Sequence, residues 1–146
     1  MFDKNRSVSL RAATAVDCDL VFEWQSQPYT RKYFKNPDVP SYQEHCNWFS
    51  DCLDSSDRQL FMVLFDGVPA GVLRLDDEGN ETYEVSIITA NAYRGQGVAK
   101  SALSLAREVH PNSVLAAVVN KDNLESKALF ESVGYEFNGE KFISPP

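Results

Sequence analysis

Hydrophobic and polar positions in the first half of the chain follow patterns typical of β-strands. Residues 7–12 alternate and predict a strand. Two apolar stretches, 60–65 and 68–75, flank Asp66-Gly67, a pair that tolerates the positive φ of a tight turn. These stretches therefore predict a β-hairpin, and residues 81–89 predict the next strand.

Two helices are predicted in the first third of the chain. Each follows a capping box, in which an acid stands three positions after a hydroxyl residue. The first box is Thr14 to Asp17, and the second is Ser41 to Glu44, preceded by Pro40. Apolar residues then recur at helical spacing: Val16, Leu20, Val21 and Trp24 in the first helix, and Tyr42, Cys46, Phe49 and Leu53 in the second. Residues 27–40 and the acidic stretch 76–81 are expected to be loops.

The second half of the chain predicts a βαβ unit. A helical period begins at Val98, and a short β-branched run over 113–119 is typical of a buried strand. The helical positions are Val98, Ala102, Leu105, Ala106 and Val109. A last helix, capped by Asp122 to Glu125, is expected to end at Gly134, and residues 135–143 supply one or two closing strands. The order of elements predicts an α/β domain with a mixed sheet.

Length and charge limit the classes of function. With 146 residues, of which 43% are hydrophobic, the chain predicts one domain over 1–146 with a core that needs no disulfides. Fourteen Lys and Arg stand against 21 Asp and Glu, a formal charge of -7, which argues against a nucleic-acid-binding module with a cationic surface. An anionic ligand would therefore need a local, dedicated pocket.

The cysteines and the apolar runs predict the compartment. Cys18, Cys46 and Cys52 are an odd number and lack metal-ligand spacing, so reduced thiols, no structural metal and a cytoplasmic protein are expected. The start of the chain lacks the apolar stretch of a signal peptide, and no run is long enough to span a membrane. No membrane partner is expected.

A glycine-rich turn carries the most specific chemical signal. Arg94-Gly-Gln-Gly-Val-Ala99 lies between a strand that ends near Thr89 and a helix that begins near Gly97. Gly95 and Gly97 allow positive φ, and the free amides at the start of a helix attract a phosphate group. A P-loop is excluded because Gly-Lys-Ser/Thr is missing, and Lys100 replaces the third glycine of a dinucleotide fingerprint. Taken alone, the junction is equally typical of a plain tight turn.

Residues 93–99 resemble the Arg-x-x-Gly-x-Gly/Ala motif of the GNAT superfamily, the acyl-coenzyme A-dependent N-acetyltransferases. A second family segment, an Asn-containing helix that ends in Gly-Phe, is similar to Asn123 to Ser126, Leu129-Phe130 and Gly134-Tyr135. The resemblance covers roughly residues 7–137. It implies a GNAT fold with about four helices, whose parallel strands 81–89 and 113–119 splay apart to admit the pantetheine arm of acetyl-CoA.

The resemblance also implies contacts with the coenzyme. It implies that backbone groups of Ile87, Ile88 and Thr89 pair with pantetheine, and that the amides of Gly95, Gln96, Gly97, Val98 and Ala99 hold the pyrophosphate. Arg94 either adds a charge-assisted contact to phosphate or is a solvated surface arginine. Asn123 either binds the coenzyme or caps its helix. Phe130 is placed with the coenzyme-binding residues, and it stands where the family usually has a tyrosine that acts as the proton donor.

Two residues are candidates for catalysis. Glu84 matches the position of a family glutamate that deprotonates the amine; alternatively it belongs to the acidic run and faces solvent. Ser126 lies three residues after the motif asparagine, where enzymes that acetylate protein N-termini have a serine; alternatively it is an ordinary helix residue. A backbone amide near Ile87 or Ile88 would polarise the thioester carbonyl.

The stretch from Arg31 to Phe49 resembles GNAT enzymes that acetylate nucleotide-linked aminosugars, such as those of pseudaminic-acid pathways. It implies that the acceptor binds Arg31, Tyr33, Phe34, His45 and Trp48; the alternative is that the aromatic residues and His45 serve packing. Three functions compete: a transferase acting on a small amine such as a UDP-aminosugar, a protein N-terminal acetyltransferase of the ribosomal-protein type, and a non-catalytic acyl-CoA sensor. No metal and no nucleic acid is expected, and the oligomeric state is left open.

Overall fold

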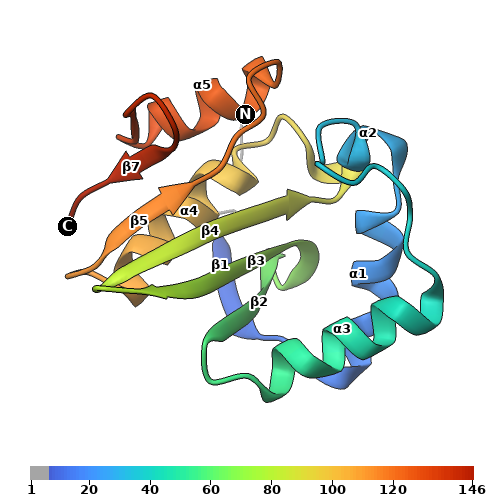
Figure 1. Cartoon of the computed structure of the whole chain (residues 1–146). Coiled ribbons are helices and arrows are strands. Elements are labelled where there is room, and N and C mark those ends of the chain that lie inside the picture. Colours follow the sequence, from blue (N-terminus) through green and yellow to red (C-terminus); the bar gives the residue numbers. More distant parts are fainter. Residues whose placement is uncertain (1–6) are drawn as a thin grey trace.

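The computed structural model describes residues 7–146, which are built on one seven-stranded sheet (Figure 1). The strand order is β1-β2-β3-β4-β5-β7-β6, and only the β4–β5 pair is parallel. The strands are β1 (Val8–Ala12), β2 (Arg58–Phe65), β3 (Val68–Gly79), β4 (Thr82–Thr89), β5 (Val114–Ala117), β6 (Glu136–Phe137) and β7 (Phe142–Ser144). The predicted mixed α/β sheet is confirmed, whereas the interpretation of the chain start rests on residues 1–6, outside the described part.

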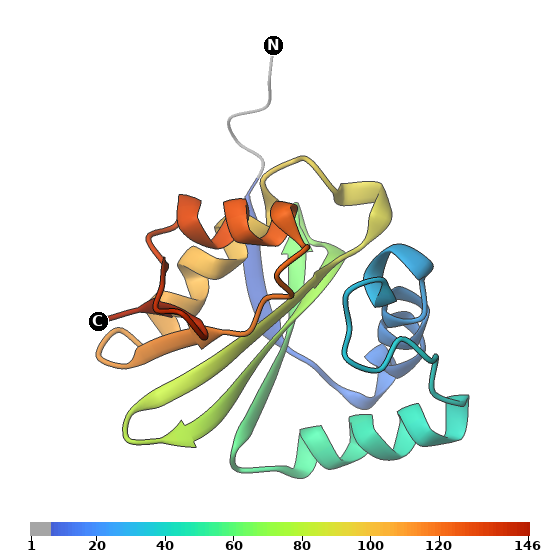
Figure 2. The same cartoon turned by 45° about the horizontal axis from the view of Figure 1, so that its top comes forward.

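Helices lie on both faces of the sheet, as Figure 2 shows. One group holds α1 (Cys18–Gln25), α2 (Pro28–Arg31) and α3 (Tyr42–Asp54), and the other holds α4 (Val98–Val109) and α5 (Leu124–Ser132). Single 3-10 turns at Ala15–Asp17 and Asn91–Tyr93 precede α1 and the turn before α4. The capping box at Ser41 is confirmed, since Ser41 Oγ accepts from the Glu44 N–H and Glu44 accepts from the Ser41 N–H.

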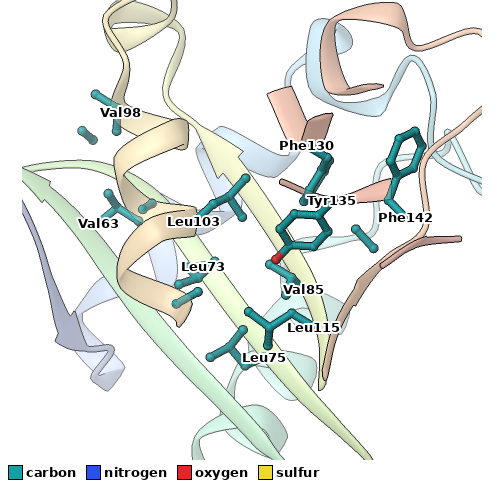
Figure 3. Packing of buried hydrophobic residues seen from close by; sticks show 14 of the residues in the cluster. Val63, Leu73, Leu75, Val85, Val98, Leu103, Leu115, Phe130, Tyr135 and Phe142 are labelled. Carbon is teal, nitrogen blue, oxygen red and sulfur yellow. The ribbon is translucent and has the colours of Figure 1, made fainter. Parts of the chain in front are cut away.

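The larger core lies between the sheet and the α4–α5 side (Figure 3). Its buried members are mostly aliphatic strand residues covered by one face of α4 and by aromatic rings from the C-terminal part. They include Val63, Leu73, Leu75, Val85, Val98, Leu103, Leu115, Phe130, Tyr135 and Phe142. A second cluster on the other face joins α1 and α3 to β2 and β3 through Val21, Trp24, Phe49, Cys52 and Met62.

The two cores fix the direction of the side chains of β4. Val85 is buried in the larger core and Ile87 packs against it, whereas Ile88 packs against the α1–α3 cluster. Because side chains alternate along a strand, Glu84 and Ser86 point to the same face as Ile88. The α1–α3 side of β4 therefore carries the polar residues.

The expected splay between β4 and β5 is present. The two strands pair only at Thr82↔Val114, Tyr83↔Leu115 and Glu84↔Ala116, although β4 continues to Thr89. The last five residues of β4 keep their β3 partners and have no partner in β5. A gap thus opens within the sheet immediately after Glu84.

Several predicted boundaries were wrong. Val16 is 86% exposed, because it sits in the 3-10 turn before α1 and not on its buried face. The loop predicted over 27–40 contains α2, which begins at Pro28, a favoured first helical residue. The fold therefore has five helices within the described residues, where about four were expected.

The acidic stretch 76–81 is mostly strand, not turn. β3 continues to Gly79, and the reversal is made by Asn80 and Glu81 alone, both with positive φ. Asp76 stays in the ladder because it pairs with Arg58 of β2 and Glu84 of β4, and its carboxylate also accepts from Arg74 Nε at 3.0 Å. The strand predicted over 113–119 is shorter, and α4 buries Leu103 as well as the predicted Ala102 and Ala106.

Candidate active site

A cleft of about 1280 Å³ lies where β4 and β5 part. Its walls come from α1 to α3, from β4, from residues 118–123 and from α5. It collects eleven of the residues predicted for the site: Arg31, Tyr33, Phe34, His45, Trp48, Glu84, Ile87, Ile88, Asn123, Ser126 and Phe130. Thr89 and residues 94–99 are not among its lining residues, and lie at the end of β4 and just beyond it.

The glycine turn (residues 94–99) has the backbone that its sequence predicts. Gly95 and Gly97 have φ of 76° and 79°, and a Cβ added at either would meet nothing within 4 Å. The first helical bond of α4 runs from the Ser101 N–H to the Gly97 carbonyl, so the preceding amides have no partner inside the helix. The Val98 side chain is buried in the core. Only its backbone is available to a ligand, which fits a site for phosphate at a helix start.

The backbone of β4 faces the gap at alternate residues. The Glu81 carbonyl accepts from the Val114 N–H on the β5 side, whereas the Ala90 N–H donates to Ala70 on the β3 side. Since backbone groups alternate along a regular strand, those of Ile87 and Thr89 point into the gap. The Ile88 carbonyl points to β3, where it would lie 2.5 Å from a Cβ at Gly71. Ile88 therefore lines the cleft by its side chain, and the predicted backbone contacts narrow to Ile87 and Thr89.

Glu84 occupies the last paired position before the gap. Its side chain lines the cleft and is about a quarter exposed, and the Lys141 ammonium lies 4.0 Å from its Oε1. Glu84 therefore faces the cleft, and its role as the base stays a prediction.

The start of α5 forms the opposite wall. Asn123 caps this helix, since its Oδ1 accepts from the Ser126 N–H at 3.1 Å. Ser126 lines the cleft from the first turn, so both of its predicted roles remain compatible with its place.

Phe130 is only 4% exposed, and its ring packs edge-on against Tyr135 at 5.0 Å. The Tyr135 side chain points into the core (Figure 3), and its hydroxyl has no hydrogen-bond partner within residues 7–146. Burial raises the pKa of Tyr135 to about 12. Tyr135 does not line the cleft, so it does not take over the role of the family tyrosine whose position Phe130 occupies.

Arg94 is exposed at the surface, where it forms an ion pair, and its predicted contact with phosphate stays a prediction. Its Nη2 donates to both carboxylate oxygens of Glu125, at 2.8 and 2.9 Å, and its guanidinium lies 4.9 Å from the centre of the Tyr29 ring. The side chain thus joins the glycine turn to α5 and to α2, two helices that line the cleft.

His45 is almost fully buried, with 1% of its surface exposed, and both ring nitrogens are engaged. Its Nε2 lies 2.9 Å from the Cys18 carbonyl, to which it must donate, so Nδ1 accepts from the Gln25 amide. Burial lowers the pKa of His45, more than the Cys18 carbonyl and Asp19 raise it. A neutral, packed histidine follows, in line with the packing alternative.

Arg31 is 9% exposed and holds the chain that follows it. It donates to Gln25 Oε1 at 2.9 Å, to the Asn36 carbonyl at 2.7 Å and to the Pro37 carbonyl at 3.3 Å. The sequence signalled Arg31 but gave no sign of Gln25, which joins it only in the folded chain. We call residues 28–40 the acceptor segment.

The three thiols are free, and Cys18 Sγ lies 3.7 Å from Cys46 Sγ while Cys52 is buried. Among residues 7–146, no three His, Cys, Asp or Glu side chains are grouped as a metal ion would require. No helix in the same range is long and apolar enough to cross a membrane.

A model of the acetyltransferase (GNAT) domain family matches residues 7–136. The chain belongs to this family. It is accordingly an N-acetyltransferase of GNAT type, with acetyl-CoA as its co-substrate. A search among curated proteins returned no match.

Solved structures show the same fold at low sequence identity. A domain from Methanocaldococcus jannaschii is 20% identical with a TM-score of 0.81, covering 95% of this chain and 97% of its own. The aminoglycoside acetyltransferase AAC(6')-Ib, in complex with ribostamycin and coenzyme A, is 14% identical with a TM-score of 0.84, covering 95% and 93%. The spermidine N-acetyltransferase from Vibrio cholerae, in complex with CoA and spermine, is 19% identical with a TM-score of 0.78, covering 93% and 91%. None of these proteins is named for a nucleotide-linked aminosugar, so that part of the resemblance stays a prediction.

Proposed function

We propose that this GNAT enzyme transfers the acetyl group of acetyl-CoA directly to a primary amine on a nucleotide-linked aminosugar. The observation that carries the transfer is the cleft at the β4–β5 gap, with Glu84 at the last paired position and Ser126 on the facing wall. Backbone amides of Gly95 to Ala99 hold the pyrophosphate. The Ile87 carbonyl and the backbone groups of Thr89 pair with pantetheine, as a neighbouring strand would, which leaves the Ile87 N–H for the thioester.

Each chemical role has one residue in this proposal. Glu84 takes a proton from the acceptor ammonium, directly or through water, so that the neutral nitrogen attacks the thioester carbonyl. The Ile87 N–H stabilises the negative charge that develops on the carbonyl oxygen. The C–S bond then breaks, and Ser126 gives a proton to the departing thiolate. The nitrogen of the new amide releases its second proton, which restores the Ser126 hydroxyl through water.

The charges of the cleft support the acceptor class. Although the chain carries -7, the cleft is lined by four cations and four carboxylates: Arg31, Lys35, Arg74 and Lys121, against Asp38, Glu44, Glu84 and Asp122. All four hydrogen bonds of the buried Arg31 within residues 7–146 go to neutral oxygens, so no bonded carboxylate cancels its charge. A polycation such as spermine or an aminoglycoside favours an acidic cleft, whereas a phosphate-linked amine fits a balanced one.

Aromatic side chains in the same cleft offer faces for a nucleobase. Phe34 is partly exposed and Trp48 is half-buried, with the Arg74 guanidinium 5.6 Å from the Trp48 ring. Every nucleobase has a flat face that can stack on such rings, whichever base it is.

The test is thiol release from acetyl-CoA with four classes of acceptor: UDP-linked aminosugars, spermidine, an aminoglycoside and short peptides with free N-termini. The proposal expects the highest kcat/KM with a UDP-aminosugar, and lower values for the same sugar without the nucleotide. Preference for peptides would instead favour the N-terminal acetyltransferase that Ser126 indicates. Tight acetyl-CoA binding without release toward any amine would favour a sensor.

The cytoplasm is the compartment we propose, because its reducing conditions keep three free thiols reduced. Acetyl-CoA and a small amine are the proposed partners.

A further inference from the structure

The acceptor segment is held by a buried cation and not by a carboxylate. Arg31 lies at the end of α2, and its guanidinium binds the carbonyls of Asn36 and Pro37, residues that follow it in the same segment. The ring of Phe34 lies 4.7 Å below the guanidinium. The side chain thus closes the segment on itself.

Gln25 anchors this closed segment to the rest of the protein. Its Oε1 and its backbone carbonyl both accept from Arg31 Nη1, at 2.9 and 3.4 Å. Because Oε1 faces the arginine, the amide nitrogen must face His45 Nδ1. The hydrogen-bonded series therefore runs from the Cys18 carbonyl through His45 and Gln25 to Arg31, and the orientation of every group in it is determined.

We propose that Gln25 is a positioning residue, which sets the acceptor segment as one wall of the acceptor site through its bond to Arg31. The hydrogen bonds from Arg31 to Gln25 Oε1 and to the Asn36 and Pro37 carbonyls, which we call the clamp, are present in the free protein. Only the role of the clamp in binding the acceptor rests on the proposed function. Arg31 then acts on the amine substrate by holding the wall that carries Tyr33, Phe34 and Lys35.

The physical basis is the cost of a buried charged donor that loses its acceptor. Burial lowers the pKa of Arg31, and only Asp38 opposes that effect through its charge. Removing Gln25 Oε1 leaves the Nη1 group with the longer 3.4 Å bond alone, and a weakened charged hydrogen bond is expensive in a buried site. The segment then opens to hydrate the guanidinium.

Proteolysis by an endoproteinase that cleaves only after lysine tests the clamp, because Lys32 and Lys35 lie inside the segment. Gln25→Leu should speed cleavage at these two positions about tenfold, as expected for local opening. Gln25→Glu keeps an oxygen for Arg31 but loses the donor to His45 Nδ1, so its cleavage rate should lie between those of the parent and Gln25→Leu. Gln27→Leu is the matched control, since the Gln27 side chain binds only the Glu23 carbonyl of its own helix end.

Kinetics separate the positioning role from a general loss of structure. Gln25→Leu should raise the acceptor KM about tenfold with little change in kcat, and acetyl-CoA affinity should stay within about twofold of the parent. Wild-type cleavage rates in Gln25→Leu, or equal acceleration in Gln27→Leu, would overturn the clamp. If no amine is acetylated at all, the proposed function fails, while the proteolysis result still decides the clamp.

Discussion

The glycine turn lies just beyond the end of β4 and the acceptor segment lines the cleft, and the two are built by different means. The turn presents backbone amides at a helix start, and its shape depends on two glycines with positive φ. The acceptor segment presents side chains, and its shape depends on Arg31 and on a glutamine in α1. A site made of backbone leaves a short motif in the sequence, whereas a site made of packed side chains leaves only scattered residues.

Substitution of Gly97, the second glycine of the turn, tests whether the turn binds acetyl-CoA. Gly97→Glu places a carboxylate beside the expected pyrophosphate and a Cβ at positive φ, so acetyl-CoA affinity should fall about 1000-fold. Calorimetry measures this. Gly67→Glu is the control, because Gly67 has φ 81° and equally open space, but lies in the β2–β3 turn. Equal coenzyme affinity in parent and Gly97→Glu would remove the site from the turn.

A substitution of Glu84, at the gap between β4 and β5, separates an effect on the chemical step from an effect on acetyl-CoA binding. Glu84→Gln should lower kcat about 100-fold, since a neutral amide cannot accept the amine proton. Acetyl-CoA affinity should stay unchanged. Glu78→Gln, at an exposed position of β3, is the control. A parent-like kcat in Glu84→Gln would exclude Glu84 as the base.

Substitution of Ser126, on the α5 wall of the cleft, should have a smaller effect on turnover than substitution of Glu84. Ser126→Ala should lower turnover about tenfold and change coenzyme affinity less, because water can replace one hydroxyl as proton donor. Single-turnover kinetics measure the step directly. Ser132→Ala is the matched control, since the Ser132 hydroxyl binds only the Leu129 carbonyl within the same helix. Unchanged turnover in Ser126→Ala would remove the hydroxyl from the mechanism.

The smallest expected effect is a loss of folding stability in acid, caused by protonation of His45 on the α1–α3 side. Burial lowers the pKa of His45 below its ordinary 6.5, so the unfolded chain binds this proton first as pH falls. The stability that neutral His45 provides is therefore complete above pH 6.5 and decreases below it. The midpoint of urea unfolding, measured at pH 7.5 and 5.5, should fall less in His45→Gln than in the parent. An identical fall in both would assign the acid effect to His110 or to other groups.

The sequence was sufficient where local chemistry decides the backbone. The glycine turn, the hairpin at Asp66-Gly67 and the capping box at Ser41 each follow from residues close in the chain, and all three have the predicted form. It failed at Val16 and in the stretch 76–81, because burial and strand pairing are set by distant segments. Asp76, for example, stays in a strand because Arg58 and Glu84 pair with it on either side.

The candidate site divides in the same way. Resemblance placed eleven residues in the cleft, but it did not distinguish Ile87 from Ile88, since the direction of each carbonyl depends on the β3 ladder. Gln25 could not be predicted, because nothing within its own helix requires a glutamine there. Its partners are 6 and 20 positions away and meet only in the folded chain.

β4 is an interior strand as far as Glu84 and an edge strand beyond it, although no edge of the molecule lies there. Edge strands invite pairing with another chain, and this one is sheltered where Val85 to Ile88 line the cleft. Its amides should consequently show two classes of hydrogen exchange in the free protein, slow at Tyr83 and fast at Ile87 and Thr89. A bound pantetheine arm would pair with these free backbone groups and slow their exchange to the rate at Tyr83. The coenzyme would then stabilise the sheet as well as take part in the reaction.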